Sequence, residues 1–554
     1  MSNPRTCSSW HALSQLKKQI STSRLSSLFQ HDSSRFDRFS IEVGSLFVDY
    51  SKNFINQQIF AQLINLAREQ KVDLAIADLQ GARQRANNVP RVPYLALRDP
   101  ALPPFILDGV DIASDIRNTR FRINRMCNDI RSWNWRGFSE KPITDIVVLG
   151  VGGAANGTHA VCNALYGFQT GAIRCHFITS ADSHNLNQLL SQLQRDTTLF
   201  VISSKSFGTH ETLHNANIAK QWATGTGVNN LVMQRHFIAI TANQKAAQSF
   251  GIDRDNTLPV WDWLPSRYSL WSSAGLPIAL CVGMERFEQL LAGANSMDQH
   301  FSQTPLEQNL PVIMAMLSVW YINFWDAPHH AILPYNETLD LLPDFVQHCL
   351  MEANGKSVNR EGQEVDYNTA PVIWGAAGSN GQHTYFQLLH QGTHTIPADF
   401  ITAVREPLLG DNHTVFTQLL AQTEALMMGD REGTILRQEA PLQEKHLPGN
   451  KPSTSILMQE LSPYCLGQLL SLYEHISFVQ SAIWDLNPFS HWGTELSKRY
   501  SNSFAQETDA TNNQAEHDPS TLGLLKQFKK WSRRPAPERS ALEQEIEENS
   551  YPFF

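Results

Sequence analysis

The stretch LFVISSKSFGTHE at residues 199–211 decides how the first half of the chain folds. Its apolar, β-branched start predicts a buried strand. After Gly208 and Thr209 the spacing of the apolar residues becomes helical. Similar apolar runs at 143–149 and 237–240 predict neighbouring strands, each followed by a helical pattern. Strands that alternate with helices in this way indicate a parallel α/β layer.

The turn after the strand also has the parts of an anion site. Ser204, Ser206 and Thr209 can donate hydrogen bonds, and Lys205 supplies a positive charge. The first N–H groups of the following helix have no partner within the helix and lie at the positive end of its dipole. These features predict binding of a phosphate monoester. The alternative is an ordinary helix cap, because Ser and Thr are common at helix N-termini.

A second strand, in ITDIVVLGVGG at 143–153, leads into closely spaced glycines, Gly153 among them. Glycine lets the backbone approach a ligand closely. The spacing G-x-G-G-x-x-x-G departs from the dinucleotide fingerprint, and the next predicted strand, at 173–178, is not followed by the acidic residue that such sites use. We therefore expect no nicotinamide cofactor.

The composition narrows the class of protein further. The chain has 554 residues, 42% of them hydrophobic, and a net charge of −9, which argues against a nucleic-acid partner. The sequence has no apolar stretch of 18 residues and no apolar signal-peptide core, so we expect no membrane partner. The seven cysteines are scattered without a C-x-x-C pair, which favours reduced thiols and a cytoplasmic location.

His383 and His390 are seven residues apart and would share one face of a helix, an arrangement that could hold a metal ion. No carboxylate follows either histidine at i+3 or i+4. Because metal-binding helices usually supply a second ligand at such a spacing, we expect no metal here.

The most regular helical pattern of the chain predicts a helix from about Leu342 to Asn354, stopped by Gly355. Glu352 then lies in its last turn. The helix dipole disfavours a carboxylate there, which makes that carboxylate a stronger base. The alternative is a solvated glutamate at a helix end.

Two basic residues in later segments are further candidates for a role in the functional site. Arg267 lies in a polar bend, and Lys498 follows His491 and Glu495 along one face of a predicted short helix. Each of these charges could equally be an ordinary solvated surface group.

Together these segments resemble the phosphoglucose isomerase family over nearly the whole chain. The resemblance is carried by motifs whose order is more specific than any one of them. The motifs are GVGGAANG at 150–157, SSKSFGTHET at 203–212, SRYSLWSSAGLP at 266–277, LPYNETLDLLPDFVQHCLMEANGKS at 333–357 with GSNGQHTYFQLLHQGT at 378–393, and YEHISFVQSAIWDLNPFSHWGTELSK at 473–498.

The resemblance implies an α/β fold with two SIS-type (sugar isomerase) domains, each a parallel sheet flanked by helices. It also implies a homodimer whose active sites lie at the subunit boundary. We expect a helical N-terminal segment at 1–115, the first SIS domain at 116–290, the second at 291–500, and a C-terminal arm and tail at 501–554.

The resemblance also assigns roles to residues that match the family motifs. Glu352 would be the proton-transfer base, His390 and Lys498 the ring-opening pair, and Arg267 the cation beside the enediolate. The residues expected to bind the substrate are Gly153, Ser204, Lys205, Ser206, Thr209, His348 and His491.

The sequence departs from the family motifs at four positions that the resemblance places around the substrate. Ala154 replaces a serine and Ser266 a glycine, while His348 and His491 each stand where glutamine is common. These departures would act on substrate affinity and pH dependence.

The expected activity is the reversible aldose–ketose isomerisation of glucose 6-phosphate and fructose 6-phosphate, a step of glycolysis and gluconeogenesis. It would proceed by ring opening and a cis-enediolate and would need no metal or redox cofactor. The alternatives are a regulatory SIS protein that binds sugar phosphates without turnover and an isomerase with another sugar-phosphate preference. A sensor needs no base, so the joint presence of the four proposed reacting groups favours an enzyme.

Overall fold

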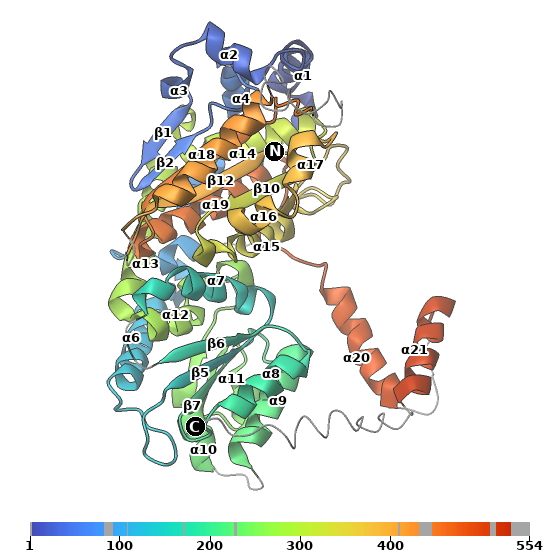
Figure 1. Cartoon of the computed structure of the whole chain (residues 1–554). Helices are drawn as coiled ribbons and strands as arrows, with labels where there is room; N and C mark the ends of the chain where they lie inside the picture. Colours follow the sequence, from blue (N-terminus) through green and yellow to red (C-terminus); the bar gives the residue numbers. More distant parts are fainter. Residues whose placement is uncertain are drawn as a thin grey trace, which may run out of the picture. The chain divides into compact units, whose positions relative to one another are not determined.

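The computed structural model describes residues 3–81, 92–107, 109–169, 171, 173–225, 230–407, 410–430, 446–509 and 517–532 (Figure 1). Parts of the predicted N-terminal segment (82–91) and of the predicted C-terminal arm and tail (510–516 and 533–554) therefore lie outside the described residues. The chain divides into two units, Met1–Ser490 and His491–Phe554, and each is described by itself.

The first sheet of the larger unit is entirely parallel, in the strand order β6-β5-β7-β8-β9. Leu149 of β5 pairs with Ile202 of β7, so both strands end at the same edge. The predicted parallel α/β layer is confirmed. The strands are β5 (Asp145–Leu149), β6 (Arg174–Ile178), β7 (Thr198–Ser203), β8 (Phe237–Thr241) and β9 (Thr257–Pro259).

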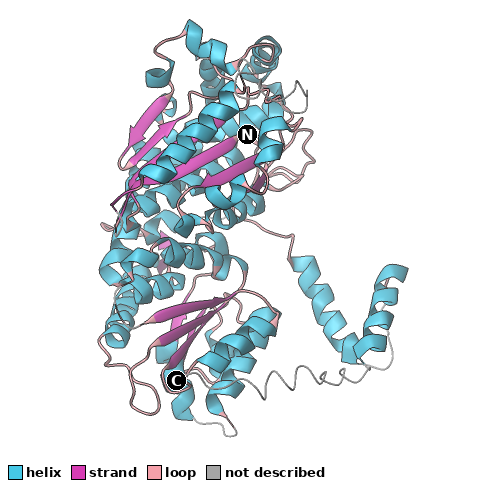
Figure 2. Cartoon of the chain, viewed as in Figure 1, coloured by secondary structure: helices cyan, strands magenta, loops and turns pink. Residues whose placement is uncertain are grey.

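Helices cover both faces of this sheet (Figure 2). Alternate residues of β7 belong to different clusters of buried side chains: Phe200 packs with residues of α8 and α9, and Val201 with residues of α7 and α12. A strand buried on both faces reads as a continuous apolar run, which is why the sequence revealed it. The flanking helices are α7 (Asn156–Ala164), α8 (Ser183–Gln192), α9 (His210–Thr224), α10 (Asn230–His236), α11 (Gln244–Phe250) and α12 (Leu276–Val282).

The second sheet has the strand order β1-β2-β14-β12-β10-β11, with β13 beside β12. Its central strands are parallel, as expected. The hairpin β1–β2 adds two short antiparallel strands that the sequence did not predict, since residues 1–115 were expected to be helical. The strands are β1 (Ser40–Val43), β2 (Leu46–Asp49), β10 (His329–Pro334), β11 (Val372–Trp374), β12 (Ala398–Glu406), β13 (Gly410–Asp411) and β14 (Ser453–Glu460), and a separate pair is β3 (Ile106–Leu107) with β4 (Val110–Asp111).

Most of the remaining helices of the larger unit lie around the second sheet, while α6 packs against α12 and β9 in the first part of the chain (Figure 1). Helix α19 is buried along almost its whole length and packs against α13, α14 and α15. These helices are α1 (Ser8–Ile20), α2 (Leu25–His31), α3 (Arg35–Arg38), α4 (Gln57–Glu69), α5 (Val72–Gly81), α6 (Ile112–Arg131), α13 (Met284–Gln303), α14 (Leu310–Phe324), α15 (Leu342–Asn354), α16 (Gly378–Gln382), α17 (Phe386–Gln391), α18 (His413–Met428) and α19 (Pro463–Ile483).

The smaller unit contains two helices, α20 (Glu495–Asp509) and α21 (Pro519–Ser532), within the part of it that the structure describes. In the described ranges of both units, no helix is long and apolar enough to cross a bilayer.

Candidate active site

An ion pair between Arg267 and Glu352 forms the centre of the candidate site. Glu352 lies in the last turn of α15, as predicted, and its Oε2 accepts a 2.7 Å hydrogen bond from Nη1 of Arg267. Arg267 lies in the short 3-10 helix η6 (Ser266–Trp271), and its side chain is fully buried, whereas that of Glu352 is 28% exposed. A buried cation and a partly exposed carboxylate are therefore in direct contact.

His348 contacts the same carboxylate oxygen. Its Nε2 lies 3.0 Å from Oε2 of Glu352, one helical turn away on α15. Residues at i and i+4 share a helix face, so the sequence carried the signal for this contact. A titratable group therefore lies directly beside the candidate base.

Gly153 brings the glycine turn against these residues. A Cβ at this position would lie only 2.3 Å from Cε1 of His348 and 2.8 Å from Cβ of Ser266, so glycine is required by close approach. The Gly153 carbonyl also accepts a 3.1 Å hydrogen bond from Oγ of Ser269. The turn after β5, helix η6 and helix α15 thus converge at one place.

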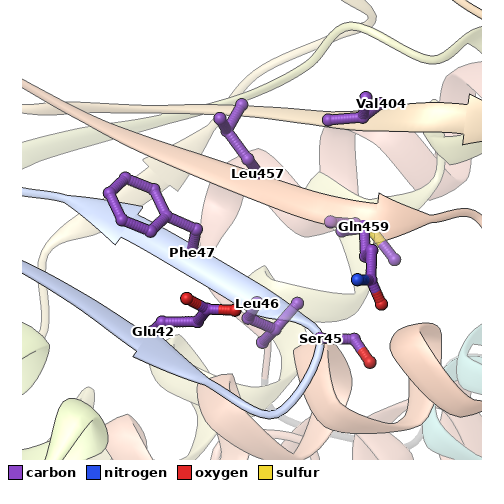
Figure 3. Close-up of a pocket in the computed structure, with 8 residues that line it drawn as sticks. Glu42, Ser45, Leu46, Phe47, Val404, Leu457 and Gln459 are labelled. Atoms are coloured by element: carbon purple, nitrogen blue, oxygen red, sulfur yellow. The ribbon is translucent and has the colours of Figure 1, made fainter.

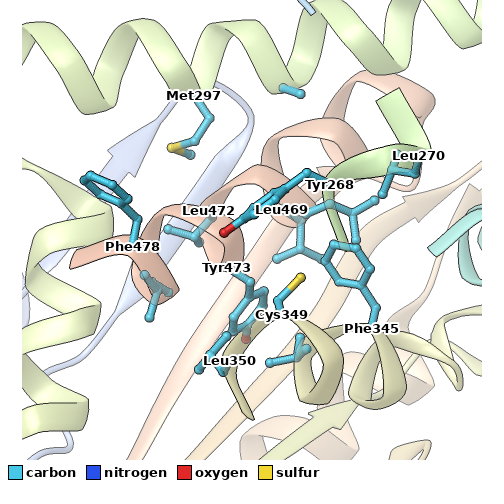
Figure 4. Packing of buried hydrophobic residues seen from close by; sticks show 14 of the residues in the cluster. Tyr268, Leu270, Met297, Phe345, Cys349, Leu350, Leu469, Leu472, Tyr473 and Phe478 are labelled. Carbon is cyan, nitrogen blue, oxygen red and sulfur yellow. The ribbon is translucent and has the colours of Figure 1, made fainter. Parts of the chain in front are cut away.

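Buried side chains hold η6 and α15 together beneath the site (Figure 4). Tyr268 and Leu270 of η6 belong to the same buried cluster as Phe345 and Cys349 of α15 and Tyr473 of α19. The close-up shows these side chains directed toward one another between the two elements. Dense packing of this kind fixes the orientation of the functional residues on the opposite side of each element.

A buried charge network anchors the other end of η6. Nε1 of Trp271 donates a 2.8 Å hydrogen bond to Glu474 of α19. Arg98 donates to Glu474 and to Asp298, and all of these bonds measure 2.6 Å. Burial raises the pKa of Glu474 to about 7, although Arg98 opposes the shift. The network lies behind the site and fixes the position of η6.

The turn after β7 gathers hydroxyl groups near the N-terminus of α9. Oγ of Ser204 lies 3.2 Å from Oγ1 of Thr209, and Thr209 is the N-cap of α9 without a side-chain cap bond. Ser206 is exposed in the same turn. The hydroxyl groups and the first N–H groups of α9 are therefore gathered at one helix N-terminus.

Lys205 turns toward the chain that precedes Arg267. Its Nζ donates to the carbonyl oxygens of Asp262 at 2.7 Å and Leu264 at 3.1 Å. Burial lowers the pKa of Lys205, while the charge of Asp262 opposes this. The sequence could not reveal these carbonyl partners, because main-chain acceptors have no residue-type signal.

His390 lies in α17, and its Nε2 is 3.1 Å from Oε1 of Gln422 in α18. The prediction that it shares a helix face with His383 is wrong, because α16 ends at Gln382 and the chain turns before α17 begins at Phe386. In the part of the chain that the structure describes, no group of three or more His, Cys, Asp or Glu side chains could hold a metal ion.

Lys498 and His491 belong to the smaller unit. Nζ of Lys498 forms a 2.7 Å ion pair with Glu495 in the first turn of α20. The predicted helix that would also carry His491 begins only at Glu495, so His491 precedes it. The prediction that Glu495 and Lys498 share a face of a helix is confirmed, since they are paired at i and i+3.

A surface pocket elsewhere in the larger unit has different chemistry (Figure 3). It lies over the β1–β2 hairpin and β14, and Glu42 is the single ionisable side chain among its lining residues. Phe47 and Leu457 supply apolar surface. It lacks the paired charges found around Glu352.

Comparisons with known proteins show the family of the chain. A family model described as phosphoglucose isomerase matches residues 49–525. A glucose-6-phosphate isomerase from Ectopseudomonas mendocina is 42% identical over 538 residues, which cover 95% of this chain and 97% of the relative. Another from Shewanella halifaxensis is also 42% identical, over 94% of this chain and 98% of the relative.

A solved structure is similar to this chain over almost its whole length. The crystal structure of a glucose-6-phosphate isomerase from Chlamydia trachomatis aligns with a TM-score of 0.82 and 26% sequence identity. The alignment covers 96% of this chain and 100% of the solved chain.

Proposed function

The chain belongs to the phosphoglucose isomerase family, and we propose that its cluster of Arg267, His348 and Glu352 catalyses the reversible isomerisation of glucose 6-phosphate and fructose 6-phosphate. The observation that carries this proposal is the 2.7 Å contact between Arg267 and Glu352. A base and a permanent cation in contact are what proton transfer next to a carbonyl requires.

The isomerisation moves one proton between C2 and C1 of the open-chain sugar. Ionised Glu352 removes the C2 proton of the aldose, and the electron pair of the broken C–H bond forms the C1–C2 double bond of a cis-enediolate. Arg267 stabilises the negative oxygen without losing a proton, since guanidinium stays charged. The hydroxyl proton on O2 passes to O1, and Glu352 then returns the carbon-bound proton to C1, which yields the ketose.

The cyclic sugar must open before this step. We assign the acid and base of ring opening to His390 and Lys498, which match the family motifs. The substrate phosphate would bind at the N-terminus of α9, where Ser204, Ser206 and Thr209 supply hydroxyl donors. Anchoring the phosphate there positions the reacting carbons.

We also propose that two chains share each site, with His390 entering the site of the partner subunit. In the single chain, Nε2 of His390 contacts Gln422, while Glu352 contacts Arg267. A protein with Glu352→Gln and one with His390→Ala, each inactive alone, should recover activity when refolded together. Random pairing makes half of the dimers mixed, and each mixed dimer has one intact site, so roughly a quarter of wild-type activity is expected. Confirmed mixed dimers without activity would contradict the proposal.

The location we propose is the cytoplasm. All seven cysteines are free thiols in the structure, which fits a reducing compartment.

Conversion of fructose 6-phosphate to glucose 6-phosphate by the purified protein, without added metal, tests the activity. Production of glucose 6-phosphate supports the proposal. Binding of fructose 6-phosphate without any turnover would instead identify a sugar-phosphate-binding protein, and faster turnover of mannose 6-phosphate would indicate another substrate preference.

A further inference from the structure

Lys356 is a basic residue close to Glu352 to which the proposed mechanism gives no role. It follows α15, just beyond the C-cap Gly355. Its Nζ donates to the carbonyl oxygen of Ala353 and, at 2.7 Å, to that of Asn487. Lys356 therefore ties the C-terminal end of the helix that carries Glu352 to a distant segment of the larger unit.

Other cations hold the same segment. Arg267 donates from Nη2 to the carbonyl oxygen of Pro488 at 2.5 Å, while its Nη1 donates to Glu352. Arg360 donates from Nε to the carbonyl oxygen of Leu486 at 2.9 Å. The main-chain oxygens that follow α19 thus accept hydrogen bonds from three basic side chains.

These contacts form a closed ring. The Glu352 carboxylate contacts Arg267, Arg267 contacts the Pro488 carbonyl, and Lys356 contacts the neighbouring Asn487 carbonyl. Lys356 closes the ring through Ala353, the residue after Glu352. Without Lys356, the end of α15 and the Asn487–Pro488 segment would be joined only through Arg267 within this ring.

We propose that Lys356 is a positioning residue for the isomerisation, and that it holds the Glu352 carboxylate against Arg267 by closing this ring. The proposal rests on the proposed function. It differs from an ordinary C-cap, in which the lysine satisfies only the last carbonyls of its own helix. Here one ammonium group bridges two segments that are 131 residues apart.

The electrostatics of Lys356 agree with this placement. Burial, together with the nearby charge of Arg267, lowers the pKa of Lys356 to about 8, while Glu352 opposes the shift. Lys356 thus lies within the electrostatic field of both members of the ion pair.

The test compares Lys356→Met with Lys356→Arg in the full-length protein. Methionine retains the apolar stem but removes the donors, whereas arginine can still donate to both carbonyls. Lys220→Met is the matched control. Nζ of Lys220 also donates a hydrogen bond to a main-chain carbonyl, that of Phe250 at 2.6 Å, but it does so on a flank of the first sheet. Circular dichroism and the melting temperature establish that each variant is folded.

We expect Lys356→Met to lower kcat about 100-fold with little change in KM, because loss of the ring moves the base relative to the reacting carbon. Lys356→Arg should recover most of kcat, and Lys220→Met should keep wild-type kcat. If Lys356→Met does not fold, Lys356→Ala, which also lacks side-chain donors, is judged on the same criterion.

A kcat for folded Lys356→Met within about threefold of wild type would overturn the inference. A rise in KM at unchanged kcat would also overturn it, since that result indicates a role in ground-state binding. A wild-type protein that does not convert fructose 6-phosphate would instead contradict the proposed function, so the two failures are distinguishable.

Discussion

Replacing Arg267 by methionine removes the buried cation at the centre of the site. Three acceptors lose a donor at once: Oε2 of Glu352 at 2.7 Å, the Pro488 carbonyl at 2.5 Å and the Ser490 carbonyl at 3.4 Å. Methionine keeps an unbranched apolar side chain but carries no charge and no hydrogen-bond donor. Arg267→Lys is the companion variant, because lysine keeps the charge but lacks the planar fork that reaches Glu352 and Pro488 together.

The expected stability cost is moderate. Breaking a buried pair by removing one partner costs about 3–5 kcal/mol, because the other charge stays buried. Glu352 is 28% exposed and keeps His348 as a neighbour, so we expect about 1–3 kcal/mol for Arg267→Met. Separately from stability, loss of the cation beside the enediolate should lower kcat about 10²–10³-fold. This decrease corresponds to a rise of about 3–4 kcal/mol in the activation barrier.

The assay pairs urea unfolding with steady-state kinetics on fructose 6-phosphate. Arg5→Met serves as the control, because it breaks an ion pair with Asp366 in which both side chains are at least half exposed. Such surface pairs contribute about 0–1 kcal/mol, and kcat should not change. A folded Arg267→Met protein whose kcat lies within about tenfold of wild type would refute the assignment of Arg267 to the enediolate.

Three further outcomes follow from the structure. Lys205→Ala should raise KM for the phosphorylated substrate more than it lowers kcat, because a charge near the phosphate contributes mainly uniform binding; an unchanged KM with a collapsed kcat would contradict this. Gly153→Ala should lower activity while the protein stays folded, because the new Cβ would lie 2.3 Å from Cε1 of His348 and must displace that ring. Wild-type kinetics in this variant would contradict the close approach. His300 has a pKa lowered to about 4 by burial and by His475, so its neutral form contributes stability above pH 6.5 that is lost as the pH falls toward 4. Urea midpoints between pH 7 and 4.5 should therefore fall less steeply in His300→Gln than in wild type, and parallel curves would exclude that role.

Much of the fold could be predicted from the sequence because its main strands are buried on both faces. The apolar run of β7 and the regular helical pattern that ends at Asn354 needed no knowledge of the rest of the chain. The hairpin β1–β2 escaped prediction because each strand has only four residues, and because it joins the second sheet only through β14, some 400 residues later.

The candidate site was predictable in its residue types but not in its contacts. The position of Glu352 at a helix end and the i, i+4 spacing of His348 could be read from the helical period. The burial of Arg267 could not, since its partners Glu352 and Pro488 lie 85 and 221 residues away. Lys205 and Lys356 donate to main-chain oxygens, and these contacts could not be predicted because every residue type carries a main-chain carbonyl.

Proton exchange with solvent tests most directly the claim that Glu352 transfers the proton between C1 and C2. Fructose 6-phosphate is incubated in D₂O with wild type, with Glu352→Gln and with Asp344→Asn, a control that removes a carboxylate from the first turn of the same helix. Nuclear magnetic resonance then follows deuterium at C2 of the product and C1 of the ketose. We predict incorporation with wild type and Asp344→Asn and none with Glu352→Gln, although the latter still binds fructose 6-phosphate. Incorporation that persists in Glu352→Gln would contradict the account, because another group would then have to remove the proton.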